Sequence, residues 1–337
     1  DLLGATNLIP GPNSTEMAIH IGYLRAGWPG LIVAGSCFIL PATVIVLGFA
    51  WAYVKYGSLA QTASVLYGVK PVIIAIVLQA LWALGRTAVK TRWLGGIGVV
   101  AVVASFLRIN ELLVLLLAGL IVGLGQTISA RRQWQKKKHR SFFPISLSAI
   151  IQTATTAGAT TGATVGTWPL FLFFLKTGSV LFGSGYVLLA FLRSDLVERW
   201  HWLTNAQLLD AVAVGQITPG PVFTTATFIG YVLAGPKGAV VATVGIFLPA
   251  FFFVAFSGPL VPRIRRSPTA GAFLDGVIVA SLALMVVVTY ELGKSALIDL
   301  PTIGLAMVSA ILLFRWKLNS AWLVLGGAAL GFLIQRG

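Results

Sequence analysis

Long apolar stretches with few charges recur along the whole chain, and short polar connections separate them. The stretches 29–54, 110–130 and 238–257 each reach or exceed the roughly 18–20 residues with which a helix crosses a hydrocarbon core of about 30 Å. Lipid offers the backbone no hydrogen-bond partners, so a spanning segment is a helix or part of a closed barrel, and no alternation typical of barrel strands occurs. The pattern predicts an all-α polytopic protein of the plasma or inner membrane.

The composition agrees with this pattern, since 57% of the residues are hydrophobic and only 10% are charged. The formal net charge of +15 would suggest nucleic-acid binding in a soluble protein. Lys and Arg lie mostly in short connections here, where positive residues mark the cytoplasmic side of a membrane, so we expect no nucleic-acid partner. The densest basic run, at 131–140, is interpreted as a solvated cytoplasmic connection, with contact to membrane lipid headgroups as the alternative.

The chain contains two related halves. Ile21-Gly22-Tyr23 recurs as Ile229-Gly230-Tyr231, and Pro10-Gly11-Pro12 recurs, shifted by one position, as Pro219-Gly220-Pro221. Agreement of Gly and Pro positions over one register indicates homologous repeats. The further matches are Ala26-Gly27 with Ala234-Gly235, Gly30 with Gly238, Leu40-Pro41 with Leu248-Pro249, and Gly68-Val69 with Gly276-Val277.

These matches divide the chain into a first repeat at 1–130, a linker at 131–167 that is basic and then rich in Thr and Gly, and a second repeat at 168–337. Asp1 aligns near Asp210, so we expect the first repeat to lack its first span. The predicted segments are 1–24, 29–54, 66–90, 93–107 and 110–130 in the first repeat, and 168–192, 208–233, 236–258, 271–297, 300–314 and 320–336 in the second.

The two repeats carry their basic connections in different places. Lys90 and Arg92 follow the segment 66–90 in the first repeat, whereas 263–266 precedes the equivalent segment in the second. The positive-inside rule therefore predicts inverted halves, with 131–140 and 263–266 both cytoplasmic. Under that topology the segment 208–233 makes no net crossing unless the linker crosses instead, and we favour a broken or re-entrant segment.

Each Pro-Gly-Pro motif interrupts an apolar segment and has polar neighbours. A proline in a helix interior costs about 3 kcal/mol, and irregular backbone at membrane depth is tolerated where protein or a watery cavity satisfies it. A helix that restarts there points free N–H groups and a positive dipole end at the cavity, which suits an anion, whereas a packed kink is the alternative. The candidate substrate-binding residues at the motifs are Pro10, Gly11, Pro12, Asn13, Thr218, Pro219, Gly220, Pro221 and Thr224.

The segment 168–192 supplies further substrate-binding candidates. Gly-Ser-Gly at 183–185 permits close backbone approach or a second break. Lys176 lies about five apolar residues inside the span, where it either extends to the interface or faces the cavity as a counter-charge. The candidates in this segment are Lys176, Phe182, Gly183, Ser184 and Gly185.

The remaining chemistry favours a transporter over an enzyme. Glu16 is the best placed acid within a span, and His20 one turn beyond is positioned to share a proton with it, so both are candidates for proton coupling. Cys37 is the only cysteine, which excludes an intrachain disulfide and a metal site built on cysteines. Catalytic metal motifs and a P-loop are both missing from the sequence, so we expect no cofactor and no direct use of ATP.

At these residues the sequence resembles the chromate ion transporter family. The matching features are the Pro-Gly-Pro of each half with its downstream Ile-Gly-Tyr, the Phe-x-Leu-Pro-Ala run at 38–42, and an element at 175–185 similar to Leu-Lys-x-Gly-x-x-x-Phe-Gly-Gly. That element reads Gly-Ser-Gly where the family has Gly-Gly-Pro, and we expect its copy in the first half to be missing because the chain starts after it. The resemblance implies export of chromate, a tetrahedral dianion similar to sulfate, and hence chromate resistance.

Several alternatives stay open at this point. A secondary transporter with its site at the junction of inverted repeats is the leading interpretation. Sulfate or a lipid-linked phosphate is the alternative substrate, because helix ends and cations recognise charge and size. The coupling ion, including proton antiport, and the formation of a homodimer are equally open.

Overall fold

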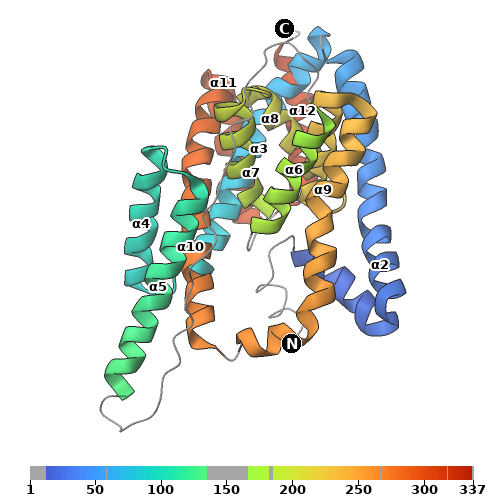
Figure 1. Ribbon diagram of the computed structural model, residues 1–337. Coiled ribbons are helices and arrows are strands. Elements are labelled where there is room, and N and C mark those ends of the chain that lie inside the picture. The colour runs from blue at the N-terminus through green and yellow to red at the C-terminus, as the bar shows by residue number, and fades with distance from the viewer. Residues whose placement is uncertain are drawn as a thin grey trace.

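The chain folds into a bundle of helices, which a computed structural model describes for residues 13–57, 59–134, 166–181, 185–265, 267–316 and 318–335 (Figure 1). The predicted all-α class is confirmed, since the described residues contain helices and no strands. The helices of the first repeat are α2 (Asn13–Tyr56), α3 (Ala60–Ala88), α4 (Arg92–Phe106) and α5 (Glu111–Trp134).

The second repeat begins with short helical pieces and continues with long helices. The short pieces are α6 (Thr167–Val180), η1 (Gly185–Val187), α7 (Leu188–Phe191), η2 (Leu192–Arg199), α8 (Asn205–Ile217) and η3 (Val222–Thr224). The helices that follow are α9 (Thr225–Arg265), α10 (Pro268–Ala296), α11 (Leu300–Trp316) and α12 (Ser320–Ile334).

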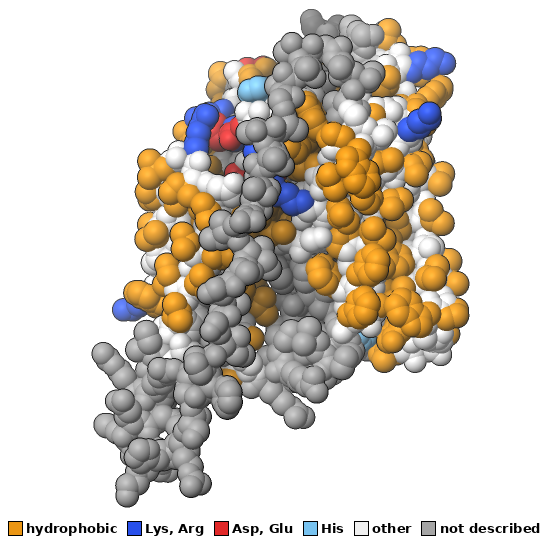
Figure 2. Space-filling view, viewed as in Figure 1, with side chains coloured by type: hydrophobic (Ala, Val, Ile, Leu, Met, Phe, Trp, Pro, Cys, Tyr) orange, Lys and Arg blue, Asp and Glu red, His pale blue; other side chains and the backbone are white. Residues whose placement is uncertain are grey.

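The surface of the bundle is that of a multi-pass membrane protein. Among the described residues, Ser14–Tyr56, Thr62–Ala88, Val222–Phe256 and Pro268–Ala296 are long and apolar enough to cross a bilayer. Large hydrophobic side chains such as Trp82, 61% exposed, cover the outside of these helices. Figure 2 shows this apolar surface, with charged side chains gathered mostly toward one end. The predicted membrane location is therefore confirmed.

Both long kinked helices turn at the same place in the repeat. Gly27 in α2 and Gly235 in α9 have positive φ angles of 60° and 64°, and the alanine before each has nearly the same angles in both copies. Glycine adopts this conformation without strain, so the Ala-Gly pair forms a tight turn between two helices. These turns fall between the predicted segments 1–24 and 29–54, and between 208–233 and 236–258.

The two repeats exchange packing partners. Helix α3 packs against α11 and α12, whereas its equivalent α10 packs against α4 and α5, and α2 packs against α9. Figure 1 shows α4 and α5 at one side of the bundle and α2 and α9 at the other. Each repeat therefore builds its core against the last helices of the other repeat.

Glycines bring the backbones together at these exchanged contacts. Gly68 of α3 meets Gly327 and Gly331 of α12, and Gly276 of α10 meets Gly119 of α5. Small residues spaced four apart allow helix backbones to approach closely, and van der Waals contact then drives association within a membrane. The two contacts occupy equivalent repeat positions, so the sequence repeat is also a repeat of packing.

Polar contacts show that α3 and α10 run in opposite directions. The hydroxyl of Tyr67, near the start of α3, donates a hydrogen bond of 2.6 Å to Asp299, just beyond the end of α10. Lys90, just beyond the end of α3, forms an ion pair of 2.7 Å with Asp275, near the start of α10. The bond from Tyr67 lowers the pKa of the Asp299 carboxyl below its ordinary value, which keeps that group ionised.

The predicted segment 168–192 is not a single helix. The structure divides this region into α6, η1, α7 and η2, with a change of direction after Val180. The cause is a set of contacts between the two parts of the region, described below. The other predicted boundaries lie within a few residues of the observed helix ends, apart from the start of α3 and the end of α9. The segments 1–12 and 135–165 lie outside the described residues.

The glycine contacts predict a large difference between two neighbouring positions of α12. A Cβ atom on Gly327 would lie 2.6 Å from the Val72 side chain and 2.8 Å from the Gly68 carbonyl oxygen, whereas one on Gly326 would meet nothing within 4 Å. We expect Gly327→Ala to lower the free energy of unfolding by about 1–3 kcal/mol through overpacking. Gly326→Ala is the matched control and should leave it unchanged. Equal thermal unfolding of both variants in detergent micelles would contradict the proposed packing.

Candidate substrate site

The first hairpin consists of α6 and the run η1–α7–η2 that follows it. Lys176 of α6 forms an ion pair of 2.9 Å with Asp195 of η2, and the rings of Phe173 and Trp200 lie 5.4 Å apart. Positions later in α6 thus meet positions earlier in η2, which is the pattern of an antiparallel pair. Helix α6 ends at Val180 and η1 begins at Gly185, and Phe182, Gly183 and Ser184 between them lie outside the described residues.

The second hairpin consists of α8, the short helix η3 and the first turns of α9. Helix α8 begins with a capping box between Thr204 and Gln207 and ends at Ile217. The following Pro219 cannot donate a backbone hydrogen bond, and the residue before a proline avoids helical angles, so Thr218 is extended. The chain is non-helical over 218–221 and then reverses.

Two glycines shape the tip of the second hairpin. Gly215 lies against Thr225 on the opposite arm, where any side chain at 215 would overlap the Thr225 hydroxyl. Gly220 has a φ angle of +150°, which L residues rarely adopt, and a Cβ there would overlap the Ala42 side chain of α2. The tip is therefore pressed against the middle of α2.

The tips of the two hairpins meet inside the bundle. A Cβ on Gly185 of the first hairpin would lie 3.4 Å from the Val222 side chain and 3.7 Å from that of Phe223. The helices α6, α7 and α8 lie together in the upper part of Figure 1. A cavity of about 10 Å³ lies between the hairpins and is lined by Gly185, Gln216 and Thr225 among others. This volume holds about one water molecule, so the tips are closed against each other in this conformation.

The threonines at the second tip bond to the backbone. The Thr218 hydroxyl donates to the Val214 carbonyl at 2.8 Å, and the Thr224 hydroxyl donates to the Pro221 carbonyl at 2.9 Å. The Thr225 hydroxyl has no hydrogen-bond partner among the described residues. Buried polar groups are usually hydrogen-bonded, so a free hydroxyl beside the tip is a candidate contact for a ligand or a water.

The start of α2 carries buried polar groups of the same kind. Thr15 and Glu16 are both 0% exposed, and neither the Thr15 hydroxyl nor the two Glu16 carboxyl oxygens have a partner among the described residues. The hydrogen bond expected between Glu16 and His20 is not formed, because Nδ1 of His20 also lacks a partner there. Glu16 and His20 stay predictions as proton-coupling residues.

The structure brings together only part of the predicted site. Gly185 and the stretch Thr218–Thr224 converge, as described above. Lys176 forms an ion pair with Asp195, and its role at the interface or toward the cavity stays a prediction. Pro10, Gly11 and Pro12 lie outside the described residues, and Asn13 is described only as the first residue of α2.

A buried ion pair that the sequence analysis did not identify links the second hairpin to the first repeat. The Asp210 carboxylate of α8, 3% exposed, lies 3.4 Å from the Lys70 ammonium of α3 and accepts a 3.0 Å hydrogen bond from the Tyr53 hydroxyl of α2. The Tyr53 ring also packs 5.1 Å from the ring of Phe228 in α9. The sequence offered one signal for this ion pair, because Lys70 is followed by a proline within an apolar span.

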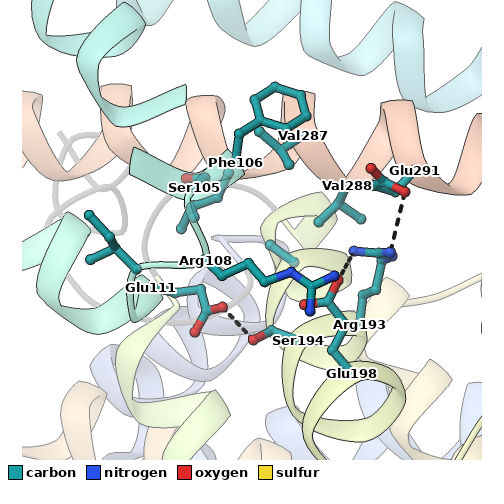
Figure 3. A pocket seen from close by; sticks show the side chains of 13 residues that line it. Ser105, Phe106, Arg108, Glu111, Arg193, Ser194, Glu198, Val287, Val288 and Glu291 are labelled. Atoms are coloured by element: carbon teal, nitrogen blue, oxygen red, sulfur yellow. Dashed lines mark hydrogen bonds and ion pairs between the residues drawn. The ribbon is translucent and has the colours of Figure 1, made fainter. Parts of the chain in front are cut away.

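A second polar network anchors the first hairpin at its open end. Arg193 of η2 forms ion pairs with Glu198 and, at 3.6 Å, with Glu291 of α10. Ser194 bonds to Glu111 at the start of α5, and Figure 3 shows these groups around a cavity of about 100 Å³, with Arg108 directed toward it. Three glutamates and two arginines line this cavity. The excess of carboxylates makes it a poor site for an anion, so we interpret the network as structural.

A multi-pass bundle of apolar helices, with non-helical backbone at 218–221 packed against α2, fits a membrane transporter, because irregular backbone within a membrane must line a cavity or face protein. Residues 1–124 and 168–332 match the family described as chromate transporter. The chain belongs to the chromate transporter family, which confirms the resemblance seen in the sequence.

Curated relatives agree with this assignment. The chain is 34% identical to the chromate transport protein of Cupriavidus metallidurans, over 97% of this chain and 80% of that relative. It is 33% identical to the probable chromate transport protein of Synechococcus elongatus, with coverages of 94% and 79%. It is 30% identical to the chromate transport protein of Pseudomonas aeruginosa, with coverages of 99% and 82%. No solved structure gives a significant match.

The network at Arg193 predicts a stability effect. The Arg193 side chain, 11% exposed, bonds to Glu198, Glu291 and Asn205, so Arg193→Ala removes three interactions and leaves Glu291 paired with Lys294 alone. We expect the free energy of unfolding to fall by about 1.5–3 kcal/mol, the range for hydrogen bonds to charged groups.

Arg199→Ala is the control for this prediction, because the Arg199 side chain is 48% exposed and lies 3.8 Å from Asp195. An exposed pair contributes about 0–1 kcal/mol. Thermal unfolding in detergent compares the two variants, and an equal loss in both would show that the network does not anchor the hairpin.

Proposed function

We propose that this chain is a secondary transporter that exports chromate through a site where the tips of the two hairpins meet. The observation that carries the proposal is the contact of Gly185 with Val222 and Phe223, which joins two irregular backbone segments inside the bundle. Family membership supports chromate as the substrate, and the names of the curated relatives support it further. Export is the direction that the resemblance implies.

The chemistry of the tips suits a dianion. A hydrated oxyanion is costly to bring into a region of low dielectric, so fixed donors must replace its water. The restart of the helix after Pro221 provides backbone N–H groups and a positive dipole end. The hydroxyls of Thr218, Thr224 and Thr225 supplement these donors, and Lys176 is the proposed cation on the first hairpin.

We further propose that the two repeats are inverted in the membrane, so that the first Pro-Gly-Pro approaches the second across a pseudo-two-fold axis. Three observations support this proposal: the exchanged packing of α3 and α10, their opposite directions, and the equal turns at Gly27 and Gly235. Inverted repeats would explain alternating access as a rocking of one half against the other. We propose with it that both hairpins are re-entrant, so that each enters and leaves the membrane on one side.

The experiment that tests the function is flux of radiolabelled chromate into inverted membrane vesicles, with and without a proton gradient. Chromate accumulation above that of vesicles without the protein is expected. Sulfate added as a competitor distinguishes a chromate transporter from a sulfate transporter. If sulfate is the preferred substrate, low sulfate concentrations will abolish chromate uptake. Failure of both anions to move would refute the proposal.

Inversion predicts which ends of the bundle face the cytoplasm. Gly123 of α5 lies near Thr269 at the start of α10, so the C-terminal end of α5 and the end of α9 lie at one end of the bundle. In a Cys37→Ser background, Ile264→Cys and a cysteine at 136 should both be labelled from the cytoplasmic side only. Labelling of Ile264→Cys from outside alone would contradict the inverted arrangement.

The tip geometry predicts the effect of filling Gly220. Gly220→Leu places a side chain where Ala42 lies, at a φ angle that L residues rarely adopt. We expect loss of chromate flux while the protein still inserts, because the tip alone is blocked.

Gly48→Leu is the control for Gly220→Leu, because Gly48 is exposed on α2 and a Cβ there meets nothing within 4 Å. Size-exclusion profiles in detergent report insertion and folding of both variants. Normal flux through Gly220→Leu would place the substrate path elsewhere.

A further inference from the structure

Lys70 has an unusual position among the basic residues of the long apolar helices. Lys70 is the one Lys or Arg of the described spans that stands well away from a helix end or a turn. These spans are Ser14–Tyr56, Thr62–Ala88, Val222–Phe256 and Pro268–Ala296. A charge at such depth is costly and usually marks a functional site. The other basic residues of these spans, each within two residues of an end or of the turns at Gly27 and Gly235, are Arg25, Lys55, Arg86, Lys237 and Lys294.

The partner of Lys70 connects it to the second hairpin. Asp210 lies eight residues before Thr218 on α8, about 12 Å along the helix from the break at a rise of 1.5 Å per residue. Tyr53 donates a hydrogen bond to Asp210 and packs against Phe228, so it contacts both arms of the hairpin. A change in this pair is therefore positioned to affect the hairpin directly.

The pairing of Lys70 with Asp210 is loose. Their closest charged atoms are 3.4 Å apart, and Oδ1 of Asp210 has no hydrogen-bond partner among the described residues. The Lys70 side chain remains 20% exposed, whereas that of Asp210 is 5% exposed. The Lys70 ammonium is thus the more accessible group of the ion pair. It has three N–H donors, and Asp210 does not occupy all of them.

The repeat shows that the fold does not need a charge at this place. The position equivalent to Lys70 in the second repeat is Ile278 of α10, which is partly buried and packs against the hydrophobic core. Replacing a buried ion pair by apolar residues is often neutral or stabilising, so packing alone does not explain a lysine here. The asymmetry between equivalent positions points to function.

We infer that Lys70 is the cation that the oxyanion substrate recruits, and that Asp210 holds the lysine in the empty transporter. An arriving dianion takes the Lys70 ammonium from Asp210, while Tyr53 keeps its hydrogen bond to the Asp210 carboxylate. Lys70 and Asp210 belong to different repeats, so this exchange of partners alters the contact between the second hairpin and α3. The inference deepens the proposed function and rests on it.

The test separates charge recognition from structural pairing. Lys70→Met alone leaves Asp210 unpaired and should lower both stability and chromate binding. The double variant Lys70→Met with Asp210→Asn removes both charges, so its thermal unfolding should return close to that of the wild type. Its binding of radiolabelled chromate in detergent should stay weaker by about tenfold or more, as loss of a charged hydrogen bond requires. Asp210→Asn alone should bind chromate at least as tightly as the wild type, because the competing carboxylate is removed.

Two matched double variants complete the experiment. Lys90→Met with Asp275→Asn removes an exposed ion pair between the same two repeats and should leave chromate binding unchanged. Lys176→Met with Asp195→Asn removes the pair of the first hairpin. Wild-type binding in the Lys70 double variant, or loss of binding in the Lys176 double variant alone, would overturn the inference while leaving the proposed function intact. A wild-type protein that neither binds nor transports chromate would refute both.

Discussion

The structure depends on one constraint, which is that backbone N–H and C=O groups have no partners in lipid. Two described stretches of this chain, Leu181 after α6 and 218–221 after α8, leave the helical conformation inside the bundle. Such segments are stable only when protein or water surrounds them, so the two tips face each other and α2 rather than the bilayer. Close contact of Gly220 with Ala42 and of Gly185 with Phe223 follows from that requirement, because a larger residue would hold the backbones apart.

Two kinds of contact hold the bundle together, and they differ in how readily they change. Backbones in direct contact at Gly68 with Gly327 and at Gly276 with Gly119 fix the distance between long helices, since any displacement loses many dispersion contacts at once. The hairpins are attached differently, through Lys176 with Asp195, through Arg193 with Glu291, and through Asp210 with Lys70. Ion pairs can exchange one partner for another with little change in shape, so the hairpins are the elements that a charged substrate is able to displace.

The sequence predicted the helices and the repeat well, because both leave a local or periodic pattern. The turns at Gly27 and Gly235 fell where the repeat placed a boundary, and the break after Ile217 followed from Pro219. The course of 168–192 was not predictable in this way, since its apolar length equals that of a full span. Its reversal depends on Lys176 meeting Asp195 and on Phe173 meeting Trp200, which are contacts between segments that no periodicity records. The ion pair of Lys70 and Asp210 was missed for the same reason, because its members lie in different repeats.

A symmetric scaffold that transports a charged substrate must place its charges asymmetrically, and this chain does so. Equivalent positions carry glycine in both repeats at the contacts of α3 with α12 and of α10 with α5, as at Gly68 and Gly276, so this part of the packing is duplicated. Two charged positions are not duplicated: Lys70 corresponds to Ile278, and Glu16 aligns with the uncharged threonines at the second tip. A second lysine at 278 would add a further charge to a packed face of α10, which is unfavourable in a low-dielectric interior unless a carboxylate pairs with it. One cation near one break is therefore compatible with a stable empty state, provided that a carboxylate such as Asp210 neutralises it until an anion arrives.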